Sequence, residues 1–255
     1  MDFFYQPVTI LKVPFMRKFI ASALLMSFVA CSAAPALARE ENPFITSREI
    51  NLIELLAPPP ANESEKTRFE LAEVIAVQST RTPEMVARAQ ADSAENIWRF
   101  ADVMGVKFKP EQLPLFTKFF QRVVDSEGAV VDTYKDVWKR PRPYLYSEMV
   151  KPVVKLSHSG SYPSGHATAG TLMGIVLSNM VPEKRAEIMA RAAEYANNRV
   201  VGGVHYRSDI EAGRITGTVI AARLQTRDDF NQAFEAAKSE LRGVLELGPE
   251  PVASK

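Results

Sequence analysis

Three short strings of residues, between positions 135 and 209, carry side chains that could hold and attack a phosphate-like dianion. In chain order, the strings are Lys135-x6-Arg142-Pro143, Pro163-Ser164-Gly165-His166 and Arg199-x5-His205-x3-Asp209. Cationic side chains bind the oxygens of a dianion, one imidazole can attack it, and a second imidazole can protonate the group that leaves. The chain has only three histidines, and two of them lie in these strings.

The second string lies where a loop rich in proline, serine and glycine gives way to a helical pattern. A helix N-terminus presents unpaired amide donors and a partial positive charge, so it binds anions readily. Gly165 lets the backbone approach a ligand, Ser164 adds a hydroxyl donor, and His166 follows on the first turn. Taken alone, these residues could also form an ordinary capped helix that carries a histidine.

The third string offers the geometry of a histidine nucleophile, which needs one ring nitrogen free and the other held. Asp209, four residues after His205, can hold the second nitrogen, and a Gly202-Gly203 turn can fold Arg199 back toward the same ligand. On its own, this spacing is better explained by a surface salt bridge. The conjunction with the other two strings is what favours catalysis.

The first string adds positive charge, with Lys135 near the end of a predicted helix and Arg142 in the proline-rich loop beyond it. Arginine donates two hydrogen bonds from a planar fork, and lysine acts as a point charge. A helix C-terminus favours basic residues in any case. The adjacent Lys139 and Arg140 are assigned no role on that ground.

The elements that position these strings are predicted to be helices. Apolar residues recur at helical spacing through most of the chain after residue 40, and no stretch shows convincing period-2 alternation. Prolines and glycines separate the helices, and Ser208 is the predicted cap of one of them. We therefore expect an all-α, single-domain protein with a loop over residues 140–164 and helices over residues 50–56, 63–78, 83–100, 113–123, 131–138, 165–176, 182–198, 209–226 and 228–247.

The overall composition limits the classes of function that the chain can have. The chain has 255 residues, of which 46% are hydrophobic and 24% charged, so it can bury a substantial core without disulfide or metal support. The formal net charge is +1 and no basic run is present. Neither the net charge nor the distribution of basic residues along the sequence therefore predicts a nucleic-acid partner.

The first forty residues are predicted to lie outside the fold. Arg17 and Lys18 precede an apolar stretch and then Ala36-Leu37-Ala38, which together are typical of a secretory signal peptide. We expect a signal peptide over residues 1–38 and a periplasmic domain over residues 39–255.

Three further points concern this N-terminal region. Met16 directly precedes Arg17, so residues 1–15 would be an upstream extension if translation starts there. One alternative to a cleaved signal is a membrane anchor retained over residues 19–38. Another is a lipoprotein modified at Cys31, which is the single cysteine of the chain.

The three strings resemble the K-x6-RP, PSGH and SR-x5-H-x3-D signature of the type 2 phosphatidic acid phosphatase superfamily, which also includes the vanadium haloperoxidases. The segments Leu55-Leu56-Ala57-Pro58-Pro59-Pro60 and Gly160-Ser161-Tyr162-Pro163-Ser164-Gly165-His166 are similar to the bacterial class A non-specific acid phosphatases. One departure is visible, because Asn198 stands where the signature has serine.

The resemblance implies an all-α, single-domain helical bundle of the acid phosphatase and vanadium haloperoxidase type. It implies that His205 attacks phosphorus to form a phosphohistidine, that Asp209 orients His205, and that His166 protonates the leaving group. The phosphate-binding residues it implies are Lys135, Arg142, Ser164, Gly165 and Arg199.

The same resemblance implies no metal and no other cofactor. The expected substrates are small-molecule phosphate monoesters, with no nucleic acid and no stable membrane insertion after signal cleavage. Relatives form dimers and larger assemblies, so a homo-oligomer remains open.

Three other functions compete with this one. A vanadate-dependent haloperoxidase would use the same anion site, although those relatives are much longer. A membrane-associated lipid phosphate phosphatase would need spans that are missing after residue 40, unless the N-terminal anchor is retained. A non-enzymatic phosphate-binding protein would not need an intact nucleophile. His158, the remaining histidine, lies in the loop before His166 and could line the entrance to the site, but we interpret it as a solvated loop residue.

Overall fold

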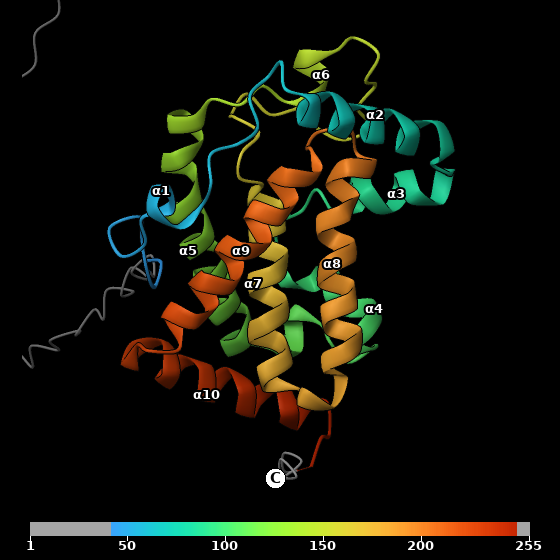
Figure 1. Cartoon of the computed structure of the whole chain (residues 1–255). Coiled ribbons are helices and arrows are strands. Elements are labelled where there is room, and N and C mark those ends of the chain that lie inside the picture. The colour runs from blue at the N-terminus through green and yellow to red at the C-terminus, as the bar shows by residue number, and fades with distance from the viewer. Residues whose placement is uncertain (1–41, 249–255) are drawn as a thin grey trace, which may run out of the picture. The chain divides into compact units, whose positions relative to one another are not determined.

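The computed structural model describes residues 42–248, and this part of the chain is built from helices without a β-strand (Figure 1). Its α-helices are α1 (Leu52–Leu55), α2 (Glu65–Thr80), α3 (Pro83–Ala91), α4 (Ala101–Met104), α5 (Pro114–Trp138), α6 (Pro143–Tyr146), α7 (Gly165–Met180), α8 (Arg185–Val201), α9 (Arg207–Leu224) and α10 (Asp228–Val244). Short 3₁₀ turns are η1 (Ile97–Phe100), η2 (Pro110–Gln112) and η3 (Pro182–Lys184). The predicted all-α class is confirmed. The predictions for the signal peptide, Met16 and Cys31 lie outside the described residues.

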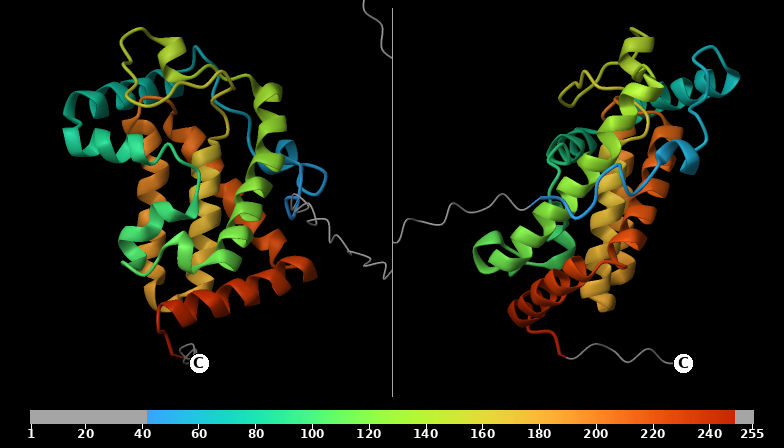
Figure 2. Two further views of the ribbon diagram at one scale, coloured as in Figure 1. Left: turned by 180° about the vertical axis from the view of Figure 1, so that it is seen from behind. Right: turned by 90° about the vertical axis from the view of Figure 1, so that its left-hand side faces the viewer.

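Helix α7 is the centre of the fold. It contains no Asp, Glu, Lys or Arg, and nearly all of its residues are buried, because a helix that is apolar on every side is stable only inside a core. It packs against α5, α8 and α9, and α10 crosses beneath its far end (Figure 1). Figure 2 shows α5 from behind, alongside α7. Between residues 42 and 248, no helix combines the length and apolarity needed to cross a bilayer.

The three predicted strings meet at one end of this bundle. Helix α7 begins there with Gly165, α8 ends there at Val201, and α9 begins there at Arg207 (Figure 1). Helix α5 brings Lys135 to the same end on its last turn. Residues that are far apart in the sequence therefore share one set of helix ends.

Two glycines let α9 approach α7 closely. A β-carbon at Gly213 would lie 2.5 Å from the carbonyl oxygen of Ser164 and 2.8 Å from Cβ of Ala167. A β-carbon at Gly217 would lie 2.5 Å from the carbonyl oxygen of Thr168. Because backbone atoms cannot yield as a flexible side chain can, the spacing of the two helices depends on these glycines.

Replacing Gly213 with alanine should therefore destabilise the fold. Overpacking of this kind costs about 1–3 kcal/mol, and we expect a loss of that size in the free energy of unfolding, measured with urea. Gly243 on α10 is the matched control, since a β-carbon there meets nothing within 4 Å. Gly243→Ala should be neutral or slightly stabilising. Equal stability of the two variants would contradict the close approach of α7 and α9.

The structure corrects several predicted helix boundaries. The helices expected over residues 113–123 and 131–138 are one continuous helix, α5, which runs through Gly128. The helix expected over residues 83–100 ends at Ala91, because Asp92 closes α3. Its predicted apolar face is divided, and Ile97 and Phe100 lie on η1.

Two helix starts also differ from the prediction. The helix expected from residue 50 begins after Asn51, whose side chain caps α1, and the preceding Thr46 and Glu49 hydrogen-bond to each other within a turn. Helix α9 begins at Arg207 with Tyr206 as its N-cap residue, so Ser208 is not the cap. Within the predicted loop over 140–164, residues 143–146 form the short helix α6.

Candidate active site

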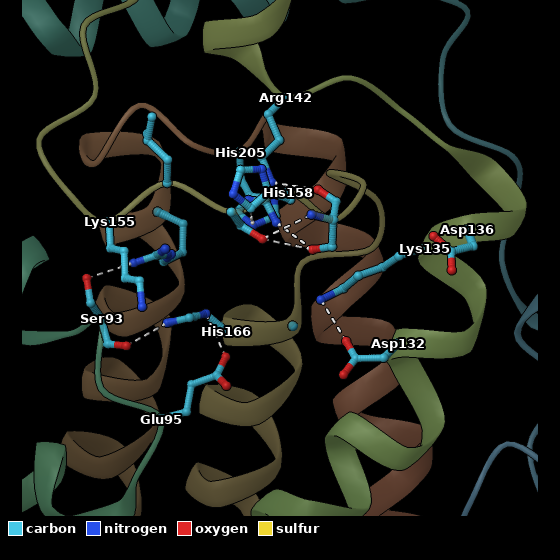
Figure 3. A pocket seen from close by; sticks show the side chains of 15 residues that line it. Ser93, Glu95, Asp132, Lys135, Asp136, Arg142, Lys155, His158, His166 and His205 are labelled. Atoms are coloured by element: carbon cyan, nitrogen blue, oxygen red, sulfur yellow. Dashed lines mark hydrogen bonds and ion pairs between the residues drawn. The ribbon is translucent and has the colours of Figure 1, made fainter.

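A cavity of about 650 Å³ opens at the end of the bundle where the three strings meet (Figure 3). Its walls come from the α3–η1 connection, the last turns of α5, the loop before α7, and the ends of α7 and α8. The residues that line it are Ser93, Glu95, Asp132, Lys135, Asp136, Arg142, Lys155, Leu156, Ser157, His158, Ser159, Gly165, His166, Arg199 and His205. Six of the eight predicted site residues are among them, and the other two, Ser164 and Asp209, are buried directly behind.

His205 is held in the orientation of a nucleophile. Its Nδ1 lies 3.3 Å from Oδ2 of Asp209, and its Nε2 lies 2.9 Å from Nη1 of Arg142. A guanidinium only donates, so Nε2 must carry the lone pair, and the ring proton is on Nδ1, facing Asp209. Burial, together with the charges of Arg142 and Arg199, holds the pKa of His205 well below its ordinary value. Both effects favour the neutral imidazole, in agreement with the lone pair that the Arg142 contact requires on Nε2.

Asp209 is fully buried and surrounded by donors. Ser161 donates from Oγ to Oδ2 at 2.5 Å, and the Tyr206 amide donates to the same oxygen at 2.8 Å. Arg140 donates from Nη1 to Oδ1 at 2.6 Å. Burial raises the pKa of Asp209, and the Arg140 charge and these hydrogen bonds oppose that rise. The carboxylate is thereby fixed with Oδ2 toward His205.

Arg140 corrects a prediction, because the sequence interpretation assigned it no role. Its guanidinium is buried, and it bridges Asp209 to Oε2 of Glu70 on α2 at 2.9 Å. It also lies 4.2 Å from the centroid of the Tyr206 ring. Arg140 therefore compensates the charge of the carboxylate that contacts His205, and it does so from behind the cavity.

His166 is held on both ring nitrogens by the connection between α3 and η1. Nδ1 lies 2.6 Å from Oε1 of Glu95, and Nε2 lies 3.2 Å from the carbonyl oxygen of Ser93. The ring of Tyr195 stacks on it at 5.9 Å. Burial lowers the pKa of His166, and Glu95 opposes that shift. The two acceptors, Glu95 and the Ser93 carbonyl, stabilise the protonated ring, but burial and the Arg199 charge outweigh them, so the net shift of the pKa is downward.

The three predicted cations converge on the face of the cavity next to His205 (Figure 3). Arg142 donates to the carbonyl oxygens of Ser159 and Val204 at 3.0 and 3.1 Å. Lys135 lies 3.0 Å from Oδ1 of Asp132, which is largely exposed. Positive charge thus accumulates beside His205.

Arg199 is the least compensated of these cations. Its Nη1 lies 3.5 Å from Oγ of Ser93, and its buried Nε has no hydrogen-bond partner within residues 42–248. Burial lowers the pKa of Arg199 to about 10, so it still carries its charge at neutral and acid pH. Buried donors without acceptors are costly, and an anion in the cavity would satisfy them.

The start of α7 is arranged as the second string predicts. Ser164 is the N-cap residue, and its Oγ accepts from the Ala167 amide at 3.3 Å, which leaves its own hydrogen to donate. Gly165 lines the cavity, and a β-carbon there would lie 3.1 Å from Oε1 of Glu127 and 3.3 Å from Nζ of Lys135. The absence of a side chain at Gly165 keeps this space for the lysine.

Two further residues, Glu127 and His158, lie at or beside the cavity. Glu127, which the sequence interpretation did not single out, is buried beside Gly165, and burial raises its pKa well above the ordinary value. His158 is exposed, as predicted, but it also lines the mouth of the cavity (Figure 3). His158 is thus an exposed loop residue, and it lies at the entrance, a position that the sequence also allows.

Comparison with known proteins agrees with this geometry. The model of the PAP2 superfamily matches residues 123–230, which include all three strings. A non-specific acid phosphatase of Salmonella typhimurium is 32% identical over 209 residues, which cover 78% of this chain and 84% of that protein. The chain belongs to the PAP2 superfamily. It is an acid phosphatase, as the resemblance predicts.

Other relatives fit the same superfamily. A non-specific acid phosphatase of Providencia stuartii is 28% identical over 205 residues, covering 76% of this chain and 82% of that protein. Among solved structures, a bacterial vanadium-dependent iodoperoxidase aligns with a TM-score of 0.52 and 19% identity, over 65% of this chain and 50% of that one. The likeness to the iodoperoxidase shows that this chain and that protein share a fold.

Proposed function

We propose that this acid phosphatase hydrolyses small-molecule phosphate monoesters through a phosphohistidine at His205. The observation that carries the proposal is the neutral, buried imidazole of His205, whose Nε2 faces a cavity in which three cations converge. Cations stabilise the charge that develops on the phosphoryl oxygens, and a held imidazole attacks phosphorus.

In the first step, Arg142, Arg199, Lys135 and the Gly165 amide bind the phosphoryl oxygens. The lone pair on Nε2 of His205 forms the N–P bond while the P–O bond to the leaving group breaks. The Nδ1 proton stays on the ring, and Asp209 stabilises the resulting positive charge at 3.3 Å. His166 gives its proton to the departing oxygen, so the leaving group is released as a neutral alcohol.

In the second step, water attacks phosphorus from the side that the alcohol left. His166, now neutral, takes one proton from the water as the O–P bond forms and the N–P bond breaks. His205 is restored with its lone pair on Nε2, and inorganic phosphate leaves. Rapid acid-free quenching with a ³²P-labelled substrate should trap label on the wild-type chain, and label that stays on a His205→Ala chain would contradict the assignment.

We also propose that hydrolysis needs no metal ion. The support is that Lys135, Arg142 and Arg199 supply three positive charges in one cavity, which is the charge that metal ions supply in other phosphatases. EDTA should leave the initial rates unchanged.

The proposed location is the periplasm, with residues 1–38 as a cleaved signal and 39–255 as the phosphatase domain. It rests on the sequence pattern of the N-terminal region alone. The protein recovered from a periplasmic extract should begin at Arg39, and an N-terminus that retains residues 19–38 would indicate an anchor instead.

The pH dependence should follow the protonation of His166. Activity requires its protonated form, so the rate falls as pH rises through the pKa of His166, which burial lowers and Glu95 raises. Glu95→Gln removes the raising contribution. We therefore expect the alkaline limb of kcat/KM to move to lower pH, measured against wild type with the same aryl phosphate.

Using one substrate for both proteins cancels the ionisation of the phosphate ester itself. Glu111→Gln is the matched control, since Glu111 is an exposed glutamate on η2 outside the cavity. An alkaline limb that stays in place in Glu95→Gln would remove Glu95 from the protonation of His166.

A further inference from the structure

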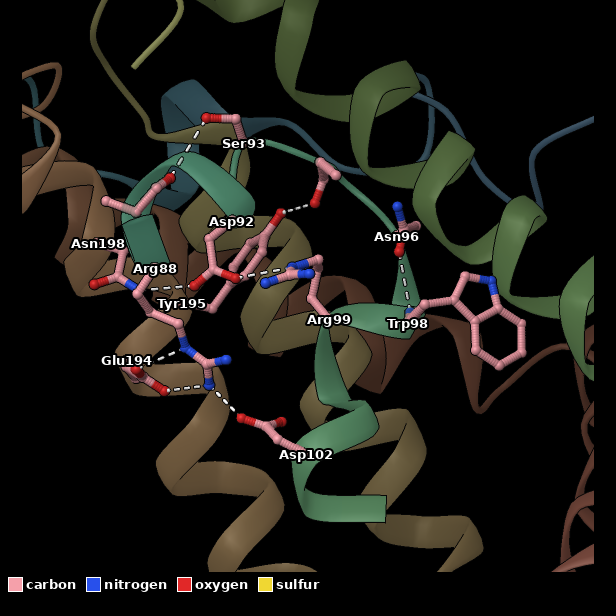
Figure 4. A network of polar contacts seen from close by, with 12 residues as sticks. Arg88, Asp92, Ser93, Asn96, Trp98, Arg99, Asp102, Glu194, Tyr195 and Asn198 are labelled. Atoms are coloured by element: carbon pink, nitrogen blue, oxygen red, sulfur yellow. Dashed lines mark hydrogen bonds and ion pairs between the residues drawn. The ribbon is translucent and has the colours of Figure 1, made fainter. Parts of the chain in front are cut away.

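Asn198, the position where the chain departs from the superfamily signature, makes a buried contact of its own. Its side chain is buried, and Nδ2 donates to Oδ2 of Asp92 at 2.7 Å (Figure 4). Asp92 is fully buried and is the residue directly after α3. The bond therefore joins the last turn of α8 to the connection between α3 and η1, over residues 92–96.

Asp92 is a fixed point in this connection. Arg99 donates from Nε to Oδ1 at 3.0 Å (Figure 4), and Arg191 of α8 donates to the same oxygen. Two guanidinium groups compensate the buried carboxylate. They occupy Oδ1, so Oδ2 is the oxygen that Asn198 holds.

The connection over residues 92–96 carries the partners of the general acid. The Ser93 carbonyl and the Glu95 carboxylate accept from the two ring nitrogens of His166. Tyr195 of α8 donates from its hydroxyl to the Ala94 carbonyl at 2.9 Å, and its ring stacks on His166. The position of His166 therefore depends on how this connection is attached to α8.

Asn198 also connects to the nucleophile side of the cavity. Its carbonyl oxygen accepts from the Gly202 amide at 2.9 Å, in the turn that leads to His205. Arg199 follows it directly, and Nη1 of Arg199 reaches Ser93. The side chain of Asn198 therefore contacts the connection that holds His166, and its backbone belongs to the turn that leads to His205.

We infer that Asn198 is a positioning residue that fixes His166 relative to His205 through its hydrogen bond to Asp92. The inference rests on the proposed function, because it takes His166 as the acid. A serine side chain ends one bond earlier than the asparagine amide, so from the same backbone it does not reach Asp92. Asn198 and Asp92 therefore act as a pair in this chain.

The effect of this pair should depend on the leaving group. An alkyl alcohol is a poor leaving group and needs the proton of His166, whereas p-nitrophenolate leaves without it. Misplacing His166 should thus slow hydrolysis of alkyl phosphates more than that of p-nitrophenyl phosphate. General loss of structure would slow both substrates alike.

The test compares kcat/KM for glycerol 3-phosphate and p-nitrophenyl phosphate, since kcat/KM reports the steps up to phosphorylation of the enzyme. Positioned acids contribute about 10²–10⁴-fold, and a displaced one loses part of that; we expect Asn198→Ala and Asn198→Ser to lose about tenfold more activity on the glycerol ester than on the aryl ester. Asn197→Ala removes an exposed amide one position earlier and should keep the wild-type ratio.

His166→Ala sets the scale, because it should change the same ratio in the same direction and by more. If both Asn198 variants lose activity equally on the two esters, or keep the wild-type ratio, the inference is wrong. If Asn198→Ala does not fold, as judged by circular dichroism, Asn198→Ser decides. A wild-type ratio in His166→Ala would instead refute the proposed acid, which separates that failure from a failure of the inference about Asn198.

Discussion

His205→Ala should abolish phosphatase activity. Loss of a nucleophile typically costs about 10⁴–10⁶-fold in kcat, and we expect a loss in that range with p-nitrophenyl phosphate. The physical reason is that no other histidine has a lone pair aimed at the three cations, whereas His205 Nε2 lies 2.9 Å from Arg142. The rate should stay low across the pH range, since the defect is not one of protonation.

His158→Ala is the matched control for this variant. His158 also lines the cavity, but it is exposed and lies at the mouth. Its removal should change kcat only slightly. His205→Ala with the wild-type rate, or the two variants with equal losses, would contradict the assignment of the nucleophile.

Asp209→Ala should lower kcat by about 10²–10⁴-fold, the scale of acid–base and orienting effects. Without the carboxylate, Nδ1 of His205 keeps only a 3.4 Å contact with Oγ of Ser161, and no negative charge beside the ring stabilises the positive charge that forms on it. The alanine variant also leaves Arg140 with a buried charge that Glu70 alone must compensate. Asp209→Asn therefore serves as the second variant, because it keeps the volume of the side chain.

Both Asp209 variants should be compared with Asp136→Asn, an exposed aspartate that lines the same cavity from α5. We expect near wild-type kcat for the control and a large loss for Asp209→Asn. Thermal melting separates a fall in stability from a fall in turnover. A folded Asp209→Asn with an unchanged rate would remove Asp209 from the mechanism.

The side chains that the three strings bring to one cavity could be predicted to lie together, because their spacing is set by local structure. His205 and Asp209 lie four residues apart at the start of one helix, and Gly165 and His166 lie on the first turn of another. Local spacing of this kind is visible without knowing the fold. The signature also fixed the order of the strings, which is why the bundle could be anticipated.

The residues that support those side chains could not be predicted in the same way. Arg140 reaches Asp209 across 69 positions, and Ser161 reaches it across 48. Glu95 lies in a connection that carries no motif, and it meets His166 only because α3 packs on α8. The sequence signals nearest to Arg140 and Ser161 are the Arg-Pro-Arg-Pro run and the Gly-Ser-Tyr-Pro run. These runs show where the chain turns but not what the two side chains contact.

Helix boundaries failed for a related reason. Helical periodicity continues through residues 83–100, yet a buried Asp92 held by two arginines ends α3 and redirects the chain. That redirection is what delivers Glu95 to His166. The boundary that sequence periodicity missed is therefore a boundary that the site requires.

The contact between Arg142 and Nε2 of His205 limits the reactivity of the imidazole. The guanidinium lies 2.9 Å from Nε2 and covers the lone pair that attacks in the proposed mechanism. A phosphate dianion is a stronger acceptor than an imidazole nitrogen, so it draws the guanidinium onto its own oxygens and uncovers the nitrogen. An uncharged electrophile of the same size does not attract Arg142 in this way, so the lone pair on Nε2 of His205 stays covered. In the proposed mechanism, selectivity for anionic esters therefore depends on the reactivity of His205 as well as on binding.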